Sequence, residues 1–147
     1  MSISKRRLTK ELREIQARPP AGIQLLDGET LDRWTLSIDG TPDSLYTGER
    51  FTLHFRFGDN YPIAAPEVTF ALPAPVHPHV YSNGHICLNI LYDQWSPALT
   101  VEAVCLSLQS MLSSCTAKAP PADDQAYCAK RVRSPKQMMW MYHDDSV

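Results

Sequence analysis

Residues 51–57 read FTLHFRF, in which large apolar side chains at positions 51, 53, 55 and 57 alternate with polar ones. This period of two is typical of a β-strand with one buried face and one face in water. The turn-forming sequence GDN at 58–60 ends the strand. His54 belongs to the wet face, so we expect a hydrated imidazole there rather than a metal ligand.

Two further strands are predicted beside this one. Residues 34–38 and 68–72 alternate in the same way, and the turn sequence DGTPD occupies positions 39–43. Three consecutive strands with short connections form an antiparallel meander, with one face packed and the other exposed. The sequence therefore predicts a sheet in the middle of the chain.

Helical periodicity lies on both sides of the strands. Residues 3–17 repeat leucine and isoleucine at helical spacing, and the double proline at 19–20 ends this helix. A second helix is predicted after Thr100, and its apolar face includes Cys105 and Cys115. Both cysteines are expected as small core residues. Residues 123–133 are a third candidate helix.

These patterns predict one α+β domain. A chain of 147 residues suits a single hydrophobic core, and the sequence shows no internal repeat and no obvious linker. We place the core domain at residues 1–133 and a variable C-terminal tail at residues 134–147.

Charge and cysteine content narrow the classes of function. Lys and Arg number 14 against 16 Asp and Glu, a net charge of −2. Nucleic acid is not expected as the main partner, because phosphate binding depends on an excess of cations. No apolar run suits a bilayer or a secretory signal, and Ser2 does not fit myristoylation, so no membrane partner is expected. Four cysteines without a Cys-x-x-Cys pair are expected as thiols in the cytoplasm or nucleus.

Residues 73–97 have no sustained period and carry the candidate chemical groups. They contain His77, His79, His85 and Cys87, and so long an irregular segment inside a compact domain is often functional. The residues alone leave three interpretations open. First, His-x-His at 77–79 and His-x-Cys at 85–87 offer suitable zinc ligands. The sequence has no compact second pair such as Cys-x-x-Cys, so no metal is expected. Cys87 could instead be a hydrolase nucleophile activated by histidine, or a carrier nucleophile on an irregular ledge.

A family resemblance favours the carrier interpretation. The sequences HPHVYSNGHICLNIL at 77–91, WSPA at 95–98 and YPIAAP at 61–66 resemble the motifs of ubiquitin-conjugating enzymes. The basic first helix and the double proline resemble that family too, so the similarity extends over residues 4–115. It implies the ubiquitin-conjugating enzyme fold, with an N-terminal helix, a four-stranded antiparallel meander, an active-site ledge and C-terminal helices.

The resemblance also implies a mechanism and its partners. An activating enzyme uses ATP to make a ubiquitin thioester and passes the ubiquitin to Cys87, which presents it to an amine with help from a RING or U-box ligase. The chain itself is expected to bind no cofactor. The resemblance assigns Arg6, Arg7 and Lys10 to the ridge that meets the activating enzyme, Ile63, Pro97 and Ala98 to the ligase-binding loops, and Asp123 and Asp124 to the flap that receives the amine.

Several positions depart from the family pattern. His79 stands where the family has an asparagine that supports the ledge and donates a hydrogen bond to the oxyanion. His79 therefore either substitutes as a catalytic donor or marks a different electrostatic arrangement. Asn89 replaces a common aspartate and Ile63 a common phenylalanine, and the flap at 115–121 is longer and lacks Asp-Pro-Asn.

Two segments resemble the W-type branch of the family. These are residues 76–85 and the tail from Trp140 to Asp145. Members of that branch transfer ubiquitin to the α-amino group of substrates and favour flexible N-termini. We therefore expect an acyltransferase that adds single ubiquitins to protein N-termini. The alternatives are a lysine-directed conjugating enzyme for ubiquitin or a ubiquitin-like modifier, and a non-catalytic ubiquitin-binding module of the same fold, against which Cys87 counts.

Overall fold

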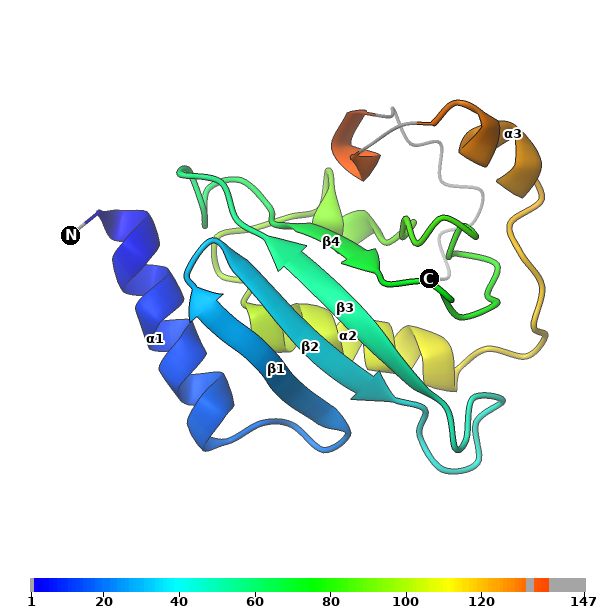
Figure 1. Ribbon diagram of the computed structural model, residues 1–147, viewed down its shortest axis with the longest axis horizontal. Helices are drawn as coiled ribbons and strands as arrows, with labels where there is room; N and C mark the ends of the chain where they lie inside the picture. The colour runs from blue at the N-terminus through cyan, green and yellow to red at the C-terminus, as the bar shows by residue number, and fades with distance from the viewer. Residues whose placement is uncertain (1, 132–133, 138–147) are drawn as a thin grey trace.

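The computed structural model describes residues 2–131 and 134–137, and its elements follow the predicted order (Figure 1). Its α-helices are α1 (Ile3–Ala17), α2 (Val101–Ser113) and α3 (Asp124–Ala129), its strands are β1 (Ile23–Thr30), β2 (Arg33–Asp39), β3 (Arg50–Arg56) and β4 (Glu67–Phe70), and short 3₁₀ turns are η1 (Asn89–Leu91) and η2 (Pro135–Gln137).

The strands form an antiparallel meander in the order β1-β2-β3-β4. Strand β3 confirms the period of two, since its apolar residues are buried, and Leu53 lies opposite Leu36 of β2. His54 is exposed, as predicted, and its Nδ1 lies 3.4 Å from the hydroxyl of Thr35. Residue periodicity missed β1, because register shifts on both sides of Asp27 interrupt its pairing and its alternation.

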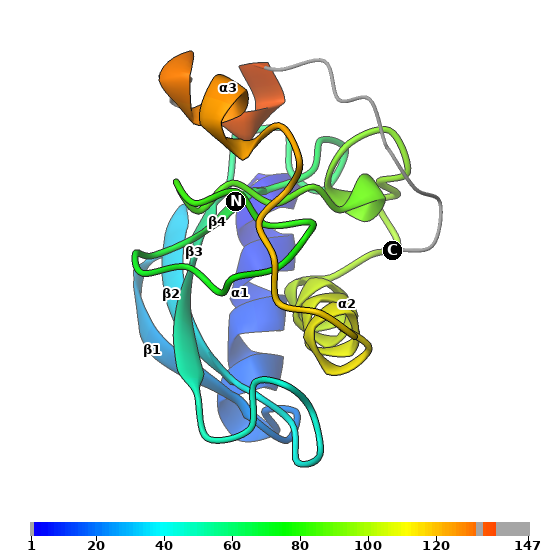
Figure 2. The same ribbon diagram turned by 90° about the vertical axis from the view of Figure 1, so that its right-hand side faces the viewer.

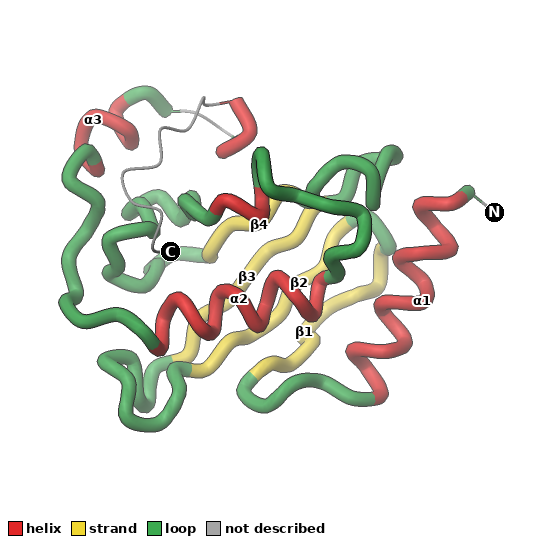
Figure 3. The backbone as a smooth tube through the Cα atoms, turned by 180° about the vertical axis from the view of Figure 1, so that it is seen from behind, coloured by secondary structure: helices red, strands yellow, loops and turns green. Residues whose placement is uncertain are grey.

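The core lies between the sheet and α2. Helix α2 runs across one face of the sheet and α1 lies beside β1 (Figures 1 and 3), and Figure 2 shows both helices on the same side of the sheet. Large side chains from both layers are removed from water, which is the main driving force for this arrangement. The most deeply buried include Trp34, Leu36, Phe55, Leu108 and Leu112.

Helix α2 begins and ends for local reasons. The helix begins after Thr100, as predicted, and the hydroxyl of Thr100 caps it by accepting a hydrogen bond from the backbone N–H of Ala103 at 3.1 Å. Cys105 is fully buried, which confirms its core position. Cys115 packs against the core but is only partly buried, and it is not on the helix as predicted, because the helix ends at Ser113.

The C-terminal helix is shorter than predicted. Helix α3 spans Asp124–Ala129 rather than 123–133, and Arg131 has a φ of 53°, which a right-handed helix does not allow. Farther on, the hydroxyl of Ser134 donates to Glu67 at 2.7 Å.

The tail signature from Trp140 to Asp145 lies outside the described residues, and the domain boundary at 133 stays a prediction. No helix in the described part of the chain is long and apolar enough to cross a membrane.

Candidate active site

The segment after β4 folds into a ledge through a few backbone contacts. His85 bridges to Thr69 of β4, and Val80 bridges to Ile86. Gly84 has a φ of 93°, and a Cβ at this position would lie 2.2 Å from the carbonyl oxygen of Phe70. Only glycine fits both requirements. The glycine thus allows the chain to turn close against β4 and brings the following cysteine back to the ledge.

Cys87 lies at the centre of this ledge. Its backbone N–H donates to the carbonyl oxygen of His79 at 2.8 Å, and its side chain is 6% exposed and clusters with Tyr81 and Tyr127. Burial raises the pKa of the Cys87 thiol to about 11, and the negative charge of Asp123 adds to the shift. The protein therefore holds this residue as a protonated thiol at neutral pH.

The acidic pair predicted from the sequence is next to this cluster. The hydroxyl of Tyr81 donates to the carboxylate of Asp123, with distances of 3.0 and 3.1 Å to its two oxygens. The backbone N–H of Ser82 donates to Oδ1 of Asp124 at 2.8 Å. Burial, together with the hydrogen bond to Asp123, raises the pKa of Tyr81. Asp123 and Asp124 thus fasten the start of α3 to the chain that leads into Cys87.

Sequence reasoning missed the aromatic part of the site. The rings of Tyr81 and Tyr127 stack with centroids 3.8 Å apart, and Nδ1 of buried His85 is 2.7 Å from the Tyr127 hydroxyl. Tyr81 is inside the quoted motif. Tyr127 follows Asp124 by three positions, which places Asp124 and Tyr127 on the same face of α3. That helical spacing was the available signal for Tyr127.

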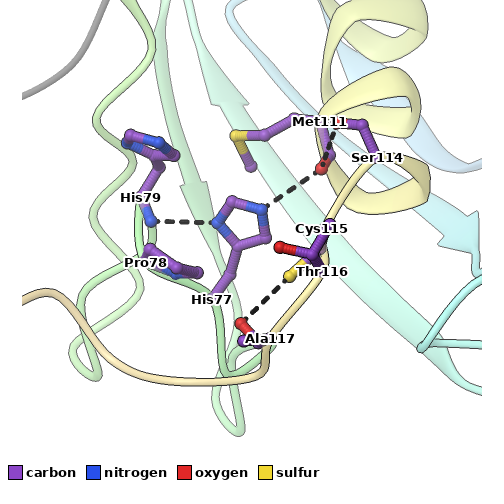
Figure 4. A pocket seen from close by; sticks show the side chains of 8 residues that line it. All are labelled: His77, Pro78, His79, Met111, Ser114, Cys115, Thr116 and Ala117. Carbon is purple, nitrogen blue, oxygen red and sulfur yellow. Dashed lines mark hydrogen bonds between the residues drawn. The ribbon is translucent and has the colours of Figure 1, made fainter. Parts of the chain in front are cut away.

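His77 orients the backbone of His79 (Figure 4). The backbone N–H of His79 donates to Nδ1 of His77 at 2.9 Å, and Nε2 of His77 lies 3.2 Å from the carbonyl oxygen of Met111. A carbonyl oxygen only accepts hydrogen bonds, so Nε2 carries the proton. Nδ1 accepts the N–H of His79 and therefore carries none, which makes the imidazole neutral. Burial lowers the pKa of His77 to about 4. The His77 ring thus links α2 to the ledge through one hydrogen bond on each side.

A cavity of about 200 Å³ adjoins the two histidines, and its far wall is the chain after α2, including Cys115 and Ala117. The Cys115 thiol donates to the carbonyl oxygen of Ala117 at 3.3 Å (Figure 4). Among the described residues, no three histidine, cysteine or acidic side chains are arranged to hold a metal ion. Both nitrogens of His77 have protein partners, so this residue is not an available ligand.

Comparison with known proteins identifies the family. The family model described as "Ubiquitin-conjugating enzyme" matches residues 7–142. The chain belongs to the ubiquitin-conjugating enzyme family. It is therefore a transferase that passes ubiquitin through a thioester, and its partners are ubiquitin, an activating enzyme and a ligase. This finding confirms the fold and the enzyme class predicted from the sequence, and it overturns the alternative of a non-catalytic module.

Several relatives are similar over nearly their whole length. The chain is 53% identical to the "Probable ubiquitin-conjugating enzyme E2 W" of Dictyostelium discoideum over 97% of this chain and 96% of that protein. It is 47% identical to the "Ubiquitin-conjugating enzyme E2 W" of Caenorhabditis elegans, with the same coverage of both chains. The crystal structure of the ubiquitin-conjugating enzyme E2 UbcA1 from Agrocybe aegerita gives a TM-score of 0.90 at 51% identity, covering 92% of this chain and 100% of that one.

The residues that the family resemblance assigned to docking lie on α1 and two loops. Arg6 and Lys10 are exposed on α1, and Ile63 is 73% exposed on the loop between β3 and β4. Pro97 and Ala98 are exposed on the loop before α2. The indole N–H of Trp95 donates to the carbonyl oxygen of Pro62 at 2.8 Å, which joins the two loops.

Arg7 departs from the ridge that the sequence predicted. Its Nε donates to Glu11 at 2.9 Å and its Nη2 donates to the carbonyl oxygen of Leu99 at 2.7 Å. Consecutive positions of an α-helix lie about 100° apart, so Arg7 is turned from Arg6 towards the interior, and its side chain is only 24% exposed. The structure therefore separates Arg7 from its two exposed neighbours.

Proposed function

We propose that Cys87 carries ubiquitin as a thioester and that the enzyme transfers it to the α-amino group of protein N-termini. The observation that supports the first half is the placement of the Cys87 thiol at the centre of a ledge, with an acidic pair and the backbone of His79 beside it. The expected ligases are of RING or U-box type, and the expected location is the cytoplasm or nucleus.

The transfer consists of two exchanges at one carbonyl carbon. In charging, Cys87 loses its proton and its sulfur attacks the ubiquitin C-terminal carbonyl. A C–S bond forms, and the cysteine of the activating enzyme leaves as a thiolate, which takes up that proton. In discharge, a neutral amine attacks the same carbon and a C–N bond forms. The amine then loses a proton and the Cys87 thiolate leaves. His79 is proposed to stabilise the oxyanion that forms in each exchange.

The preference for α-amines rests on the state of the acidic pair. Asp123 is already hydrogen-bonded to Tyr81, and Asp124 to the backbone of Ser82. Both carboxylates already accept hydrogen bonds from the ledge, so they are weaker acceptors for the N–H groups of an incoming ammonium. An acceptor that supplies its own neutral amine is then favoured.

Proton chemistry separates the two kinds of amine. At pH 7 a lysine amine is neutral roughly 0.04% of the time, whereas an α-amine is neutral roughly 14% of the time. The greater nucleophilicity of the more basic lysine recovers part of this difference. A flexible N-terminus also reaches the ledge without breaking local structure. The lysine-directed alternative requires an acidic pair that is free to draw a proton from the acceptor.

Charging is tested by incubation with activating enzyme, ATP and ubiquitin, followed by a non-reducing gel. Wild type should give an adduct that a thiol reductant removes, and Cys87→Ser should give no adduct or one that resists reductant. Cys128→Ala is the matched control, because Cys128 packs against the same cluster and should leave charging intact. A reducible adduct on Cys87→Ala would exclude Cys87 as the carrier.

The acceptor is tested with the charged enzyme. Discharge should occur onto a flexible peptide that has a free N-terminus and no lysine. Acetylation of the N-terminus should abolish transfer, even when the peptide contains a lysine. Equal rates with free lysine and with the unblocked peptide would favour the lysine-directed alternative. The pH dependence gives a second measure, since discharge onto the α-amine should level off above its own pKa.

A further inference from the structure

Glu11 is a buried carboxylate that joins three parts of the docking surface. Its side chain on α1 is 4% exposed. Its oxygens accept hydrogen bonds from Nε of Arg7 at 2.9 Å, from the hydroxyl of Tyr61 at 2.6 Å and from the backbone N–H of Val101 at 2.7 Å. Tyr61 lies in the loop that carries Ile63, between β3 and β4, and Val101 is the first residue of α2.

These donors make the carboxylate tolerable inside the protein. An unpaired buried charge is strongly disfavoured, whereas charge-assisted hydrogen bonds compensate it. The backbone N–H of Val101 lies at the N-terminus of α2, where the helix dipole favours a negative charge. Burial and the hydrogen bond to Glu11 raise the pKa of Tyr61, which keeps this hydroxyl a donor. All three donor positions are thereby fixed relative to one another.

Arg7 extends the network to the second loop. Its guanidinium spans Glu11 and the carbonyl oxygen of Leu99, the residue after Ala98, and it lies 5.9 Å from the centre of the Tyr61 ring. A planar fork with several fixed donors can make both contacts at once, which a lysine cannot do. The helix that bears Arg6 and Lys10 is thus tied to both loops through two side chains.

We propose that Arg7 and Glu11 are positioning residues that hold helix α1 and the two loops as one docking surface. Arg7 then acts inward through Glu11 and does not meet the activating enzyme directly. The inference rests on the proposed function, because a docking surface matters only if an activating enzyme charges this chain, and on the docking roles that the family resemblance assigns to these elements. Core stability alone does not require the pair, because well-packed apolar residues often replace a buried ion pair without loss.

The test compares variants in charging by activating enzyme, ATP and ubiquitin. Arg7→Lys keeps the positive charge but loses the fork, and Glu11→Gln keeps one acceptor but loses the negative charge. Each should raise KM for the conjugating enzyme by roughly fivefold or more, the lower range of couplings between sites. The value of kcat should stay within about twofold, because the reacting atoms are untouched.

Arg50→Lys is the matched control. Arg50 also pairs through Nε with a carboxylate, that of Asp39 at 2.6 Å, but this pair is exposed and lies at the end of β3 away from Tyr61. It should charge as wild type does. The double variant of Arg7 and Glu11 should be no worse than the more severe single variant, because both changes break one network. If the two losses multiply, or if Arg7→Lys charges normally, the proposal is wrong.

Backbone amide spectra separate this inference from the proposed function. Resonances of Ile63 and Ala98 should shift in both single variants, without any ubiquitin present, while those of β2 stay in place. Tyr61→Phe removes one donor only and provides a milder variant if Glu11→Gln does not fold. Unchanged loop resonances in a folded variant would overturn the positioning role. Failure of wild type to charge would overturn the proposed function alone.

Discussion

The rings of Tyr81 and Tyr127 stack with centroids 3.8 Å apart and an interplanar angle of 14°. Tyr81 belongs to the ledge and Tyr127 to α3, so this contact, with the hydrogen bonds of Asp123 and Asp124, fastens α3 over the segment that bears Cys87. A helix as short as Asp124–Ala129 is unstable by itself and depends on such packing. The burial of the Cys87 thiol therefore depends on a helix that two aromatic rings hold in place.

Removing the ring of Tyr127 should expose the thiol. Tyr127→Ala is expected to destabilise the protein by roughly 3 kcal/mol, typical of a large aromatic truncation. It should also speed alkylation of Cys87 by iodoacetamide, because less burial lowers the pKa of the thiol. Tyr127→Phe is the control: it keeps the stack and loses the hydroxyl contact with His85, at a cost of about 1 kcal/mol. Alkylation of Tyr127→Ala at the wild-type rate would contradict this account.

The raised pKa of Cys87 predicts a steep pH dependence of its reactivity. With a pKa of about 11, the reactive thiolate should increase about tenfold per pH unit between pH 7 and pH 10. Asp123→Asn removes a negative charge near the sulfur and should lower the pKa, so that alkylation at pH 8 becomes faster. The measurement is the alkylation rate of the Cys87 peptide by mass spectrometry, with Cys87→Ser as the blank. A plateau below pH 9 would show that the thiol is not shifted.

His79 should matter for transfer more than for folding. If its side chain stabilises the oxyanion, His79→Ala should slow discharge onto a free amine by about 100- to 1,000-fold. Its backbone carbonyl, which accepts from Cys87, remains in the variant. Single-turnover discharge of purified charged enzyme gives the rate, and thermal unfolding gives the stability. An unchanged rate with a lowered melting temperature would leave His79 only a structural role.

The sequence predicted the fold well where period and motif agree. The alternation at 51–57 corresponds to β3, which pairs with a strand on either side, and α2 begins directly after Thr100 as expected. The acidic pair at 123–124 was carried over from the family and does lie beside the ledge. Such features depend on neighbours along the chain or on a motif of fixed order, both of which a sequence displays.

The arrangements that the residue patterns did not reveal depend on contacts between distant segments. Arg7 has the charge and spacing of a surface residue, and its inward orientation depends on Leu99, which is 92 positions away. The stack of Tyr81 on Tyr127 joins segments 46 positions apart, and α3 is too short for a reliable period. Strand β1 was hidden by register shifts at Asp27. No local pattern encodes these arrangements, because packing decides them.

The buried imidazole of His77 predicts a loss of stability in mild acid. Its pKa falls from about 6.5 in the unfolded chain to about 4 in the folded protein, chiefly through burial. Above pH 6.5 both states are neutral at this residue and stability does not depend on it. Between pH 6.5 and pH 4 the unfolded chain takes up a proton that the folded protein does not, so the free energy of unfolding falls. The loss from this residue should approach roughly 3 kcal/mol near pH 4.

A substitution isolates this contribution from that of other acid-titrating groups. Gln has no titrating nitrogen, and in His77→Gln its amide can still donate to the carbonyl oxygen of Met111, which now binds Nε2. The variant should be less stable than wild type at pH 7.5, because glutamine fills the buried site of the imidazole less well. The difference between the two proteins should shrink as the pH falls to 4.5, since only wild type loses the His77 contribution. Urea unfolding at several pH values measures this difference, and a difference that stays constant with pH would show that His77 does not titrate as proposed.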